Sequence, residues 1–330
     1  MDKLRLSIAM CTYNGAQYLQ EQLDSIAAQS RLPDELVVCD DRSSDSTTEI
    51  VKSFMSKVSF PVRIHINEEN IRIIKNFEKA ISLCTGDIIA LCDQDDVWKP
   101  NKLEKILTAF AENIGAGYVF SDADLVNENL QPLGSSFLQS VAFKGNLFEQ
   151  YIHGNQVGVL LKRNVVCGAT MAFRASLKSL VLPISSSAML LHDAWIALLA
   201  SSAGFHGVPL SDSLIYYRQH TTQSIGGKDT FSKKLKRVQK TKGGEFYEKH
   251  KQELLEVRDR LKQNETTFSK DIHNELNLIQ QKANHYARRA FIRSSSNLPL
   301  KLKAIATETL TGKYHRFSTS WQSVAKDLWL

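Results

Sequence analysis

Three carboxylates stand within four positions directly after an apolar segment of this chain. The apolar segment is Asp87–Cys92, and Asp93, Asp95 and Asp96 follow it. Successive side chains of an extended strand point to opposite sides, so Asp93 and Asp95 can share one side. Carboxylate oxygens are the ligands that Mg²⁺ and Mn²⁺ prefer, and such ions keep open positions for phosphate oxygens. This Asp-x-Asp motif predicts a cation site for a diphosphate-bearing substrate; the alternative is a solvated acidic turn or helix cap.

Further polar clusters follow other apolar segments. Thr12–Asn14 come after the first one, Asp40–Asp41 after the second and Asp122–Asp124 after a later one. The carboxyl ends of parallel strands meet at one edge of a sheet, and ligands bind there. The repeated pattern therefore indicates a site built from loops at that edge.

The elements that must position these clusters alternate between strand and helix. Strands are expected over 4–11, 35–40, 61–66, 87–92 and 116–122, and helices over 17–28, 46–55, 71–84 and 100–112. Beyond Asp124 we expect extended segments over 156–166 and 167–174, a helix over 188–203 and a strand over 208–217. Such alternation predicts an α/β fold, with a mostly parallel Rossmann-like sheet flanked by helices.

The composition changes near residue 228. Residues 228–330 carry 22 Lys+Arg against 11 Asp+Glu, whereas residues 1–227 carry 19 against 24. We expect a catalytic domain over 1–227 and a basic helical region over 228–330. The helices of that region are expected over 230–239, 246–264 and 271–294, with a further helical stretch from Pro299.

Several classes of protein are disfavoured. There is no apolar segment of about 18 residues, which a membrane span needs. The N-terminus lacks the apolar stretch and cleavage site of a signal peptide. The five cysteines lie scattered in apolar segments, which favours reduced thiols in a cytoplasmic protein. The chain shows no nucleic-acid-binding module, so we expect no nucleic-acid partner.

Four motifs in order resemble family 2 glycosyltransferases, which have the type A nucleotide-sugar fold. They are SIAMCTYNG from Ser7, VCDDRSSDST from Val38, LCDQDDVW from Leu91 and HDAW from His192. The resemblance covers about residues 4–227. The HDAW motif and the ending Tyr217–His220 are similar to a rhamnosyltransferase-like branch.

The resemblance and the chemistry together imply roles for these residues. Asp193 is the candidate catalytic base, with service as a helix N-cap as the alternative. Asp93, Asp95 and His220 are the expected ligands of Mg²⁺ or Mn²⁺. The alternative for His220 is a purely structural role. Arg218 is expected to pair with a phosphate or with a local carboxylate. The residues expected to bind the nucleotide are Thr12, Tyr13, Asn14, Asp40, Asp41 and Asp93, with turn formation as the alternative for Asp40 and Asp41 and ordinary packing for Tyr13.

The expected activity is an inverting, metal-dependent sugar transfer from a nucleoside-diphosphate sugar. The resemblance favours dTDP-L-rhamnose, with a UDP-hexose as the second choice, and a surface polysaccharide or lipid-linked glycan as the acceptor. A sugar nucleotidyltransferase and a non-catalytic sugar-nucleotide-binding module are the alternatives. We expect a cytoplasmic location, at the inner face of the cell membrane if the acceptor is lipid-linked. The basic C-terminal helices are expected either to contact that membrane or to pack on the catalytic domain.

Overall fold

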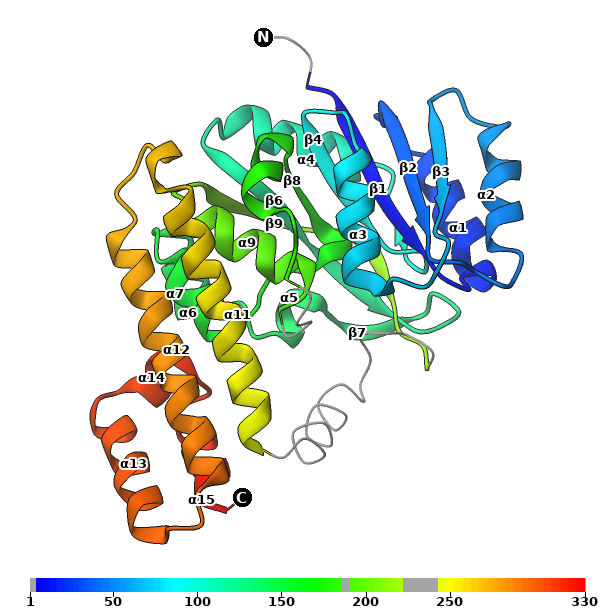
Figure 1. Cartoon of the computed structure of the whole chain (residues 1–330). Helices are drawn as coiled ribbons and strands as arrows, with labels where there is room; N and C mark the ends of the chain where they lie inside the picture. The colour runs from blue at the N-terminus through cyan, green and yellow to red at the C-terminus, as the bar shows by residue number, and fades with distance from the viewer. Residues whose placement is uncertain (1–3, 186–189, 222–242, 330) are drawn as a thin grey trace.

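The computed structural model describes residues 4–185, 190–221 and 243–329. Figure 1 shows a twisted sheet with helices on both faces, and a group of C-terminal helices that extends away from one side of it. Within the described part of the chain, no helix combines the length and the apolar character that crossing a bilayer requires.

The first half of the sheet is parallel, as the alternating pattern predicts. Its strands, in spatial order β3-β2-β1-β4, are β1 (Leu6–Thr12), β2 (Glu35–Asp40), β3 (Val62–Ile66) and β4 (Ile88–Cys92). The helices between and after them are α1 (Ala16–Ala27), α2 (Thr47–Met55), α3 (Arg72–Leu83) and α4 (Lys102–Glu112). Every residue of β1, β2 and β4 is buried, because helices cover both faces of the sheet.

The second half makes the sheet mixed. Short strand β8 (Met171–Arg174) lies antiparallel between β4 and β6 (Ala116–Val126). The long strand β9 (His206–Arg218) then pairs in parallel with β6. Two small antiparallel strands complete the sheet, β5 (Val97–Trp98) beside β9 and β7 (Pro132–Ser136) beside β6. Parallel pairing is therefore concentrated in β1–β4 and in the β6–β9 pair.

The region between β6 and α9 differs most from the sequence prediction. Residues 156–166, expected to be extended, begin with helix α7 (Gln156–Lys162). Residues 167–174 contain a 3₁₀ turn, Gly168–Thr170, before β8 begins. An apolar segment this short fits a buried helix as well as a strand, so its pattern could not decide between them. Three further short helices were not predicted, namely α5 (Phe137–Ser140), α6 (Asn146–Ile152) and α8 (Lys178–Val181).

Helix α9 (His192–Ser202) is buried along its whole length. It packs against β6 and β9 of the sheet, α3, and the C-terminal helix α11. A helix enclosed on all sides needs no polar face, which explains its nearly uniform apolar composition. Its enclosure fixes the position of the two polar residues at its start, His192 and Asp193.

The C-terminal region is helical, as the sequence predicts for residues 246–264 and 271–294 and for the stretch that begins at Pro299. It contains α11 (Gly243–Gln263), α12 (His273–Ser294), α13 (Leu298–Leu310), α14 (Lys313–Phe317) and α15 (Trp321–Trp329). Leu254, Val257 and Ile279 of α11 and α12 belong to the same apolar core as α3 and α9. The expected helix 230–239 and the expected domain boundary at 228 lie outside the described residues, so the boundary stays a prediction.

Candidate active site

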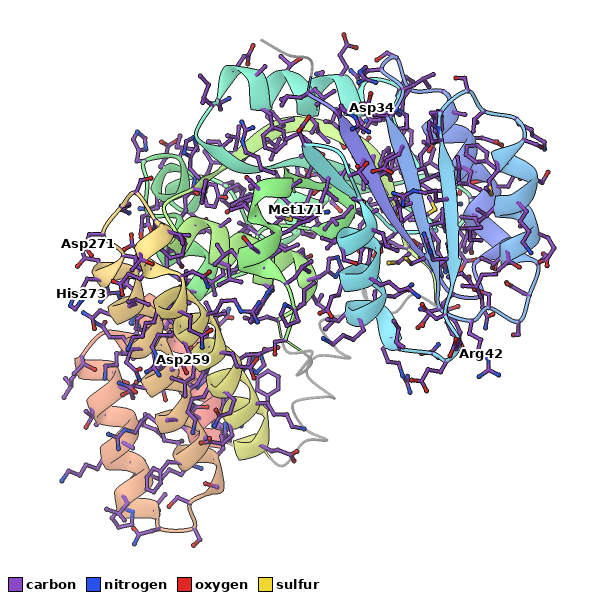
Figure 2. All side chains as sticks on the ribbon, turned by 45° about the horizontal axis from the view of Figure 1, so that its top comes forward. Asp34, Arg42, Met171, Asp259, Asp271 and His273 are labelled. Carbon is purple, nitrogen blue, oxygen red and sulfur yellow. The ribbon has the colours of Figure 1, made fainter. Side chains whose placement is uncertain are left out.

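The polar clusters after β1, β2 and β4 lie at one edge of the sheet. The three strands are mutually parallel or share a parallel neighbour, so their carboxyl ends point the same way. Figure 2 labels Asp34, just before β2, and Arg42, just after it, and these two residues mark the opposite edges. The sequence pattern predicts the site at the edge near Arg42, where the carboxyl ends of the parallel strands lie.

Burial and mutual repulsion raise the pKa values of two carboxyl groups in the acidic loop after β4. Burial and the carboxylates of Asp95 and Asp193 raise the pKa of Asp93 to about 7. Asp96 is fully buried, and desolvation together with the charges of Asp95 and Asp93 raises its pKa well above the usual range. Oδ2 of Asp96 has no hydrogen-bond partner in the described structure. Clustered carboxylates of this kind favour a bound cation.

Arg218, the last residue of β9, holds this loop in place. Its Nε donates to the backbone oxygen of Asp95 at 2.8 Å, and its backbone N–H donates to Oδ1 of Asp96 at 3.1 Å. Its guanidinium pairs with Glu21 and lies 4.5 Å from the ring centre of Tyr18. Arg218 thus pairs with a local carboxylate, that of Glu21, which is one of the two interactions expected for it. Its contacts with Asp95 and Asp96 position the acidic loop.

His220 contacts the same loop. Its Nε2 lies 2.8 Å from Oδ2 of Asp95. Among the described residues, no group of three or more His, Cys, Asp or Glu side chains is arranged to hold a metal by itself. Asp93, Asp95 and His220 nevertheless offer the oxygen and nitrogen donors that suit Mn²⁺, and the first two suit Mg²⁺. The chemistry of these donors is therefore compatible with a divalent ion.

Asp193 occupies the first turn of α9, close to the acidic loop. It is hydrogen-bonded to Gly168 of the 3₁₀ turn that packs against β4, and its charge contributes to the raised pKa of Asp93. Backbone N–H groups hold both of its oxygens: Gly168 donates to Oδ2 at 2.9 Å and Ala194 donates to Oδ1 at 2.6 Å. Burial raises the pKa of Asp193 to about 6, against the lowering effect of these hydrogen bonds. Asp193 is therefore held in one orientation, with a pKa nearer to neutral pH than that of an ordinary aspartate.

His192 precedes the base and has no hydrogen-bond partner among the described residues. Its ring stacks on Phe77 with centroids 4.0 Å apart, and neither ring nitrogen is paired within that part of the chain. Burial lowers the pKa of His192 to about 3, so the imidazole is neutral. A Cβ at Gly168 would come within 2.6 Å of its Nε2. Glycine at 168 therefore lets the backbone approach both His192 and Asp193.

The loops after β1 and β2 are joined through buried hydrogen bonds. Oγ1 of Thr12 donates to Oδ2 of Asp40 at 2.7 Å, and Oγ of Ser43 donates to the same oxygen at 2.6 Å. The backbone N–H of Ser43 donates to Oδ1 of Asp40 at 2.8 Å. Asp40 and Thr12 are both buried, and their hydrogen bonds organise the two loops.

Asp41 performs a similar task for the next loop. Its Oδ1 accepts from the backbone N–H of Ile71 at 2.8 Å, and its Oδ2 accepts from that of Arg72 at 2.9 Å. Nδ2 of Asn67 also donates to Oδ1, at 3.0 Å. Arg72 has a positive φ of 70°, which these bonds help to hold. The turn-forming role left open for Asp41 is thus present in the structure.

Tyr13 and Asn14 are the two predicted nucleotide residues that face solvent. The Tyr13 side chain is 50% exposed. Gln94 of the acidic loop accepts from the backbone N–H of Tyr13 at 2.8 Å and donates to its oxygen at 3.1 Å. A Cβ at Gly15 would lie 2.2 Å from Oε1 of Gln94, so a larger residue there would displace the Gln94 side chain. Gln94, which the sequence did not single out, thereby fixes Tyr13 next to the carboxylates.

Lys102 is the other functional candidate that sequence reasoning missed. Its side chain is fully buried, and Nζ donates to the backbone oxygen of Ala169 at 2.7 Å. Burial lowers its pKa to about 8, against the raising effect of the neighbouring Cys92 and Asp96. One signal could have found it. Lys102 stands four residues before Ile106, and both lie on the buried face of α4.

Comparison with known proteins identifies a family for this chain. Residues 7–180 match Glycosyl transferase family 2. "Putative glycosyltransferase EpsE" of Bacillus subtilis (strain 168) is 30% identical over 219 residues, which cover 65% of this chain and 73% of EpsE. The dTDP-rhamnosyl transferase RfbG of Shigella flexneri is 25% identical over 247 residues, which cover 69% of this chain and 78% of RfbG.

Two solved structures resemble the fold. The S. aureus TarS 1-349 complex with UDP-GlcNAc has a TM-score of 0.56 at 18% identity, covering 93% of this chain and 81% of that chain. Mannosyltransferase PcManGT from Pyrobaculum calidifontis, in complex with GDP-Man and Mn²⁺, has a TM-score of 0.51 at 16% identity, covering 99% and 88%. At these identities the likeness establishes the fold alone.

Proposed function

This chain belongs to glycosyltransferase family 2, and on that basis we propose that it transfers a sugar from a nucleoside-diphosphate sugar to a glycan hydroxyl. The observation that carries the proposal is that Asp193 is hydrogen-bonded to the turn Gly168–Thr170, which packs against β4, the strand that leads into the acidic loop. A module that only bound sugar nucleotides would have no need for a buried, oriented carboxylate there. A nucleotidyltransferase would need a glycine-rich basic loop after β1 for the triphosphate, and Thr12–Gly15 lacks one.

Asp193 acts as the catalytic base in this proposal. A sugar hydroxyl is a weak nucleophile near neutral pH, and a carboxylate within hydrogen-bond reach removes its proton as it attacks the anomeric carbon. Attack from the face opposite the departing diphosphate inverts the anomeric configuration, through a transition state with oxocarbenium character. The N–H groups of Gly168 and Ala194 keep the carboxylate oriented during the transfer.

Mg²⁺ or Mn²⁺ would be held by Asp93, Asp95 and His220. When bound, such an ion neutralises the diphosphate and makes it a better leaving group. The clustered carboxylates and the unpartnered oxygen of Asp96 support this assignment. The structure of PcManGT in complex with GDP-Man and Mn²⁺ supports it from another protein of the same fold.

The nucleotide would lie over the loops after β1 and β2. Tyr13 offers an exposed ring to the base, and the exposed Asn14 lies beside it, with its Oδ1 accepting from the backbone N–H of Ser44 at 2.8 Å. Thr12, Asp40 and Asp41 complete the proposed set, and their internal hydrogen bonds support a role in shaping the loops. Asp93 joins this set from the acidic loop, on the diphosphate side.

The proposed donor is dTDP-L-rhamnose, with a UDP-hexose as the second choice. The dTDP-rhamnosyl transferase RfbG, 25% identical over much of the chain, supports the first. The UDP-GlcNAc bound by TarS supports the second through the shared fold. The proposed acceptor is a surface polysaccharide or a lipid-linked glycan, which would place the enzyme in the cytoplasm at the inner face of the membrane.

Donor recognition can be tested by thermal unfolding with added nucleotides. We expect the melting temperature to rise with dTDP or UDP, and to rise further when Mn²⁺ is also present, because ligands that bind only the folded state stabilise it. GDP serves as the comparison nucleotide. If dTDP, UDP and GDP all leave the melting temperature unchanged at millimolar concentrations, the proposed donor site is wrong.

A further inference from the structure

Helix α13 turns apolar side chains away from the protein. Leu302, Ala306 and Leu310 follow one another at four-residue spacing on its exposed side. Leu310 is 88% exposed and Leu302 is 45% exposed. The opposite face, with Ala304 and Ile305, packs into a small apolar core shared with α12, α14 and α15. The outward leucines therefore contribute nothing to that core.

Helix α15 shows the same arrangement in a stronger form. Its exposed side carries Trp321, Leu328 and Trp329, of which Trp329 is 88% exposed. Its buried side includes the polar residues Ser323 and Asp327. Val324 packs into the small apolar core from the same buried side, so the exposed tryptophans and Leu328 are apolar groups that this core does not use. Its outer face is suited to an apolar or interfacial environment.

Between Leu276 and Trp329, every exposed charged side chain is basic. From Leu276 to Trp329 the only acidic residues are Glu308 and Asp327, and both are buried. Asp327 accepts from Arg289 at 2.7 Å and from Tyr314 at 2.7 Å, so its charge is engaged inside the helical group. Glu308 is engaged inside the same group, 2.5 Å from the ring of His285.

The exposed charges are cationic. Lys303 and Arg316 are exposed, and Lys301 is half-buried. Basic side chains beside outward-facing leucines and tryptophans complement a surface that is both anionic and apolar beneath.

We propose that the outer faces of α13 and α15 bind the surface of an anionic lipid membrane. The proposal rests on the outward-facing leucines and tryptophans and on the exposed basic side chains beside them. Tryptophan is favoured at the membrane–water interface, leucine is favoured just below it, and lysine and arginine are attracted to anionic headgroups. Among the described aromatic residues of the region, Tyr247 and Tyr286 are instead enclosed between α11 and α12 and take no part. The inference rests on the proposed function for its purpose, since membrane binding would hold the enzyme near a lipid-linked acceptor.

Vesicle co-sedimentation tests this surface without using the transfer reaction. The full-length chain is mixed with vesicles of phosphatidylcholine alone, or of equal parts phosphatidylcholine and phosphatidylglycerol. We expect binding to the mixed vesicles that weakens with added salt. The double variants Leu302→Gln/Leu310→Gln and Trp321→Ser/Trp329→Ser should each lower the partition coefficient about tenfold or more. Lys303→Gln should lower it about fivefold.

Ile114→Ser is the matched control, because Ile114 is 77% exposed and lies outside the C-terminal helices, two residues after α4. It should bind vesicles as the parent chain does. Circular dichroism checks that each variant keeps its helices. Absence of binding to mixed vesicles, or equal binding by the parent and both double variants, would overturn the proposal. So would a lipid-free dimer that these double substitutions dissociate, since the faces would then bind a second copy.

The proposed function is tested by a separate measurement. Hydrolysis of the donor sugar in solution, without vesicles, should be the same for the parent and the double variants. Vesicle binding without any donor turnover would retain the membrane surface and reject the proposed function. Donor turnover without vesicle binding would retain the proposed function and reject the membrane surface.

Discussion

Oδ2 of Asp193 accepts a 2.9 Å hydrogen bond from the backbone N–H of Gly168. The two residues come from different elements, the 3₁₀ turn before β8 and the first turn of α9. The same turn is held from a third element by Lys102, whose Nζ donates to Ala169. The orientation of the proposed base therefore depends on a turn that is itself anchored to α4.

Replacing Asp193 with asparagine should remove the base and leave the site otherwise intact. We expect the transfer rate to fall about 10²- to 10⁴-fold, which is the usual contribution of a general base. Donor affinity, measured by calorimetry, should stay close to that of the parent. Asp212→Asn is the control, because Asp212 is exposed and pairs with Lys105. Transfer at the parent's rate would reject the assignment of Asp193.

The rate should depend on pH through the same carboxylate. Burial raises the pKa of Asp193 to about 6, and the active form is the deprotonated one. As the pH falls through about 6, the carboxylate is protonated, and kcat should drop about tenfold for each further pH unit. The measurement is kcat at saturating donor between pH 5 and 8. A profile that stays flat down to pH 5 would contradict the prediction, and the residual activity of Asp193→Asn should lack this limb.

Lys102→Met should affect the chemical step more than donor binding. The substitution leaves the carbonyl of Ala169 without its donor and loosens the turn that orients Asp193. A small misplacement of a catalytic group costs up to about a hundredfold in rate, and we expect kcat to fall about tenfold or more. The KM for the donor should change little. Lys105→Met, on the exposed side of the same helix, is the control. A rise in KM with unchanged kcat would point to donor binding instead.

His220→Ala should weaken metal activation. If His220 holds the ion with Asp93 and Asp95, its loss should raise the Mn²⁺ concentration for half-maximal activity about 10- to 100-fold. Direct Mn²⁺ titration in the presence of nucleoside diphosphate gives a second readout. His153→Ala, at an exposed position after α6, is the control. Unchanged Mn²⁺ dependence would make His220 a structural partner of Asp95 only.

Much of the sheet could be predicted because its signals are local. The strands β1, β2 and β4 are apolar throughout most of their length, and each is followed by polar turn residues and an amphipathic helix. The acidic loop could be located for the same reason. The helix α7 could not be predicted, because seven residues with an apolar majority carry no distinct period.

The partners of the site residues could not be predicted, because they come from distant parts of the chain. Asp95 and His220 are 125 positions apart in sequence, and Lys102 and Ala169 are 67 apart. No spacing rule connects such pairs. The buried state of Asp40 was likewise invisible, because an acidic residue after a strand has the same sequence signal whether it faces a ligand or accepts from Thr12 and Ser43.

The hydrogen bonds between the first two loops have a thermodynamic consequence. Ser43 accepts from the backbone N–H of Asn14, and Thr47 accepts from that of Gly15, both at 2.8 Å, while Asp45 accepts from that of Ala16 at 3.1 Å. Loops tied together in this way are already ordered before any ligand arrives. A nucleotide that docks on them has little chain entropy to remove, so more of its contact energy is available as affinity.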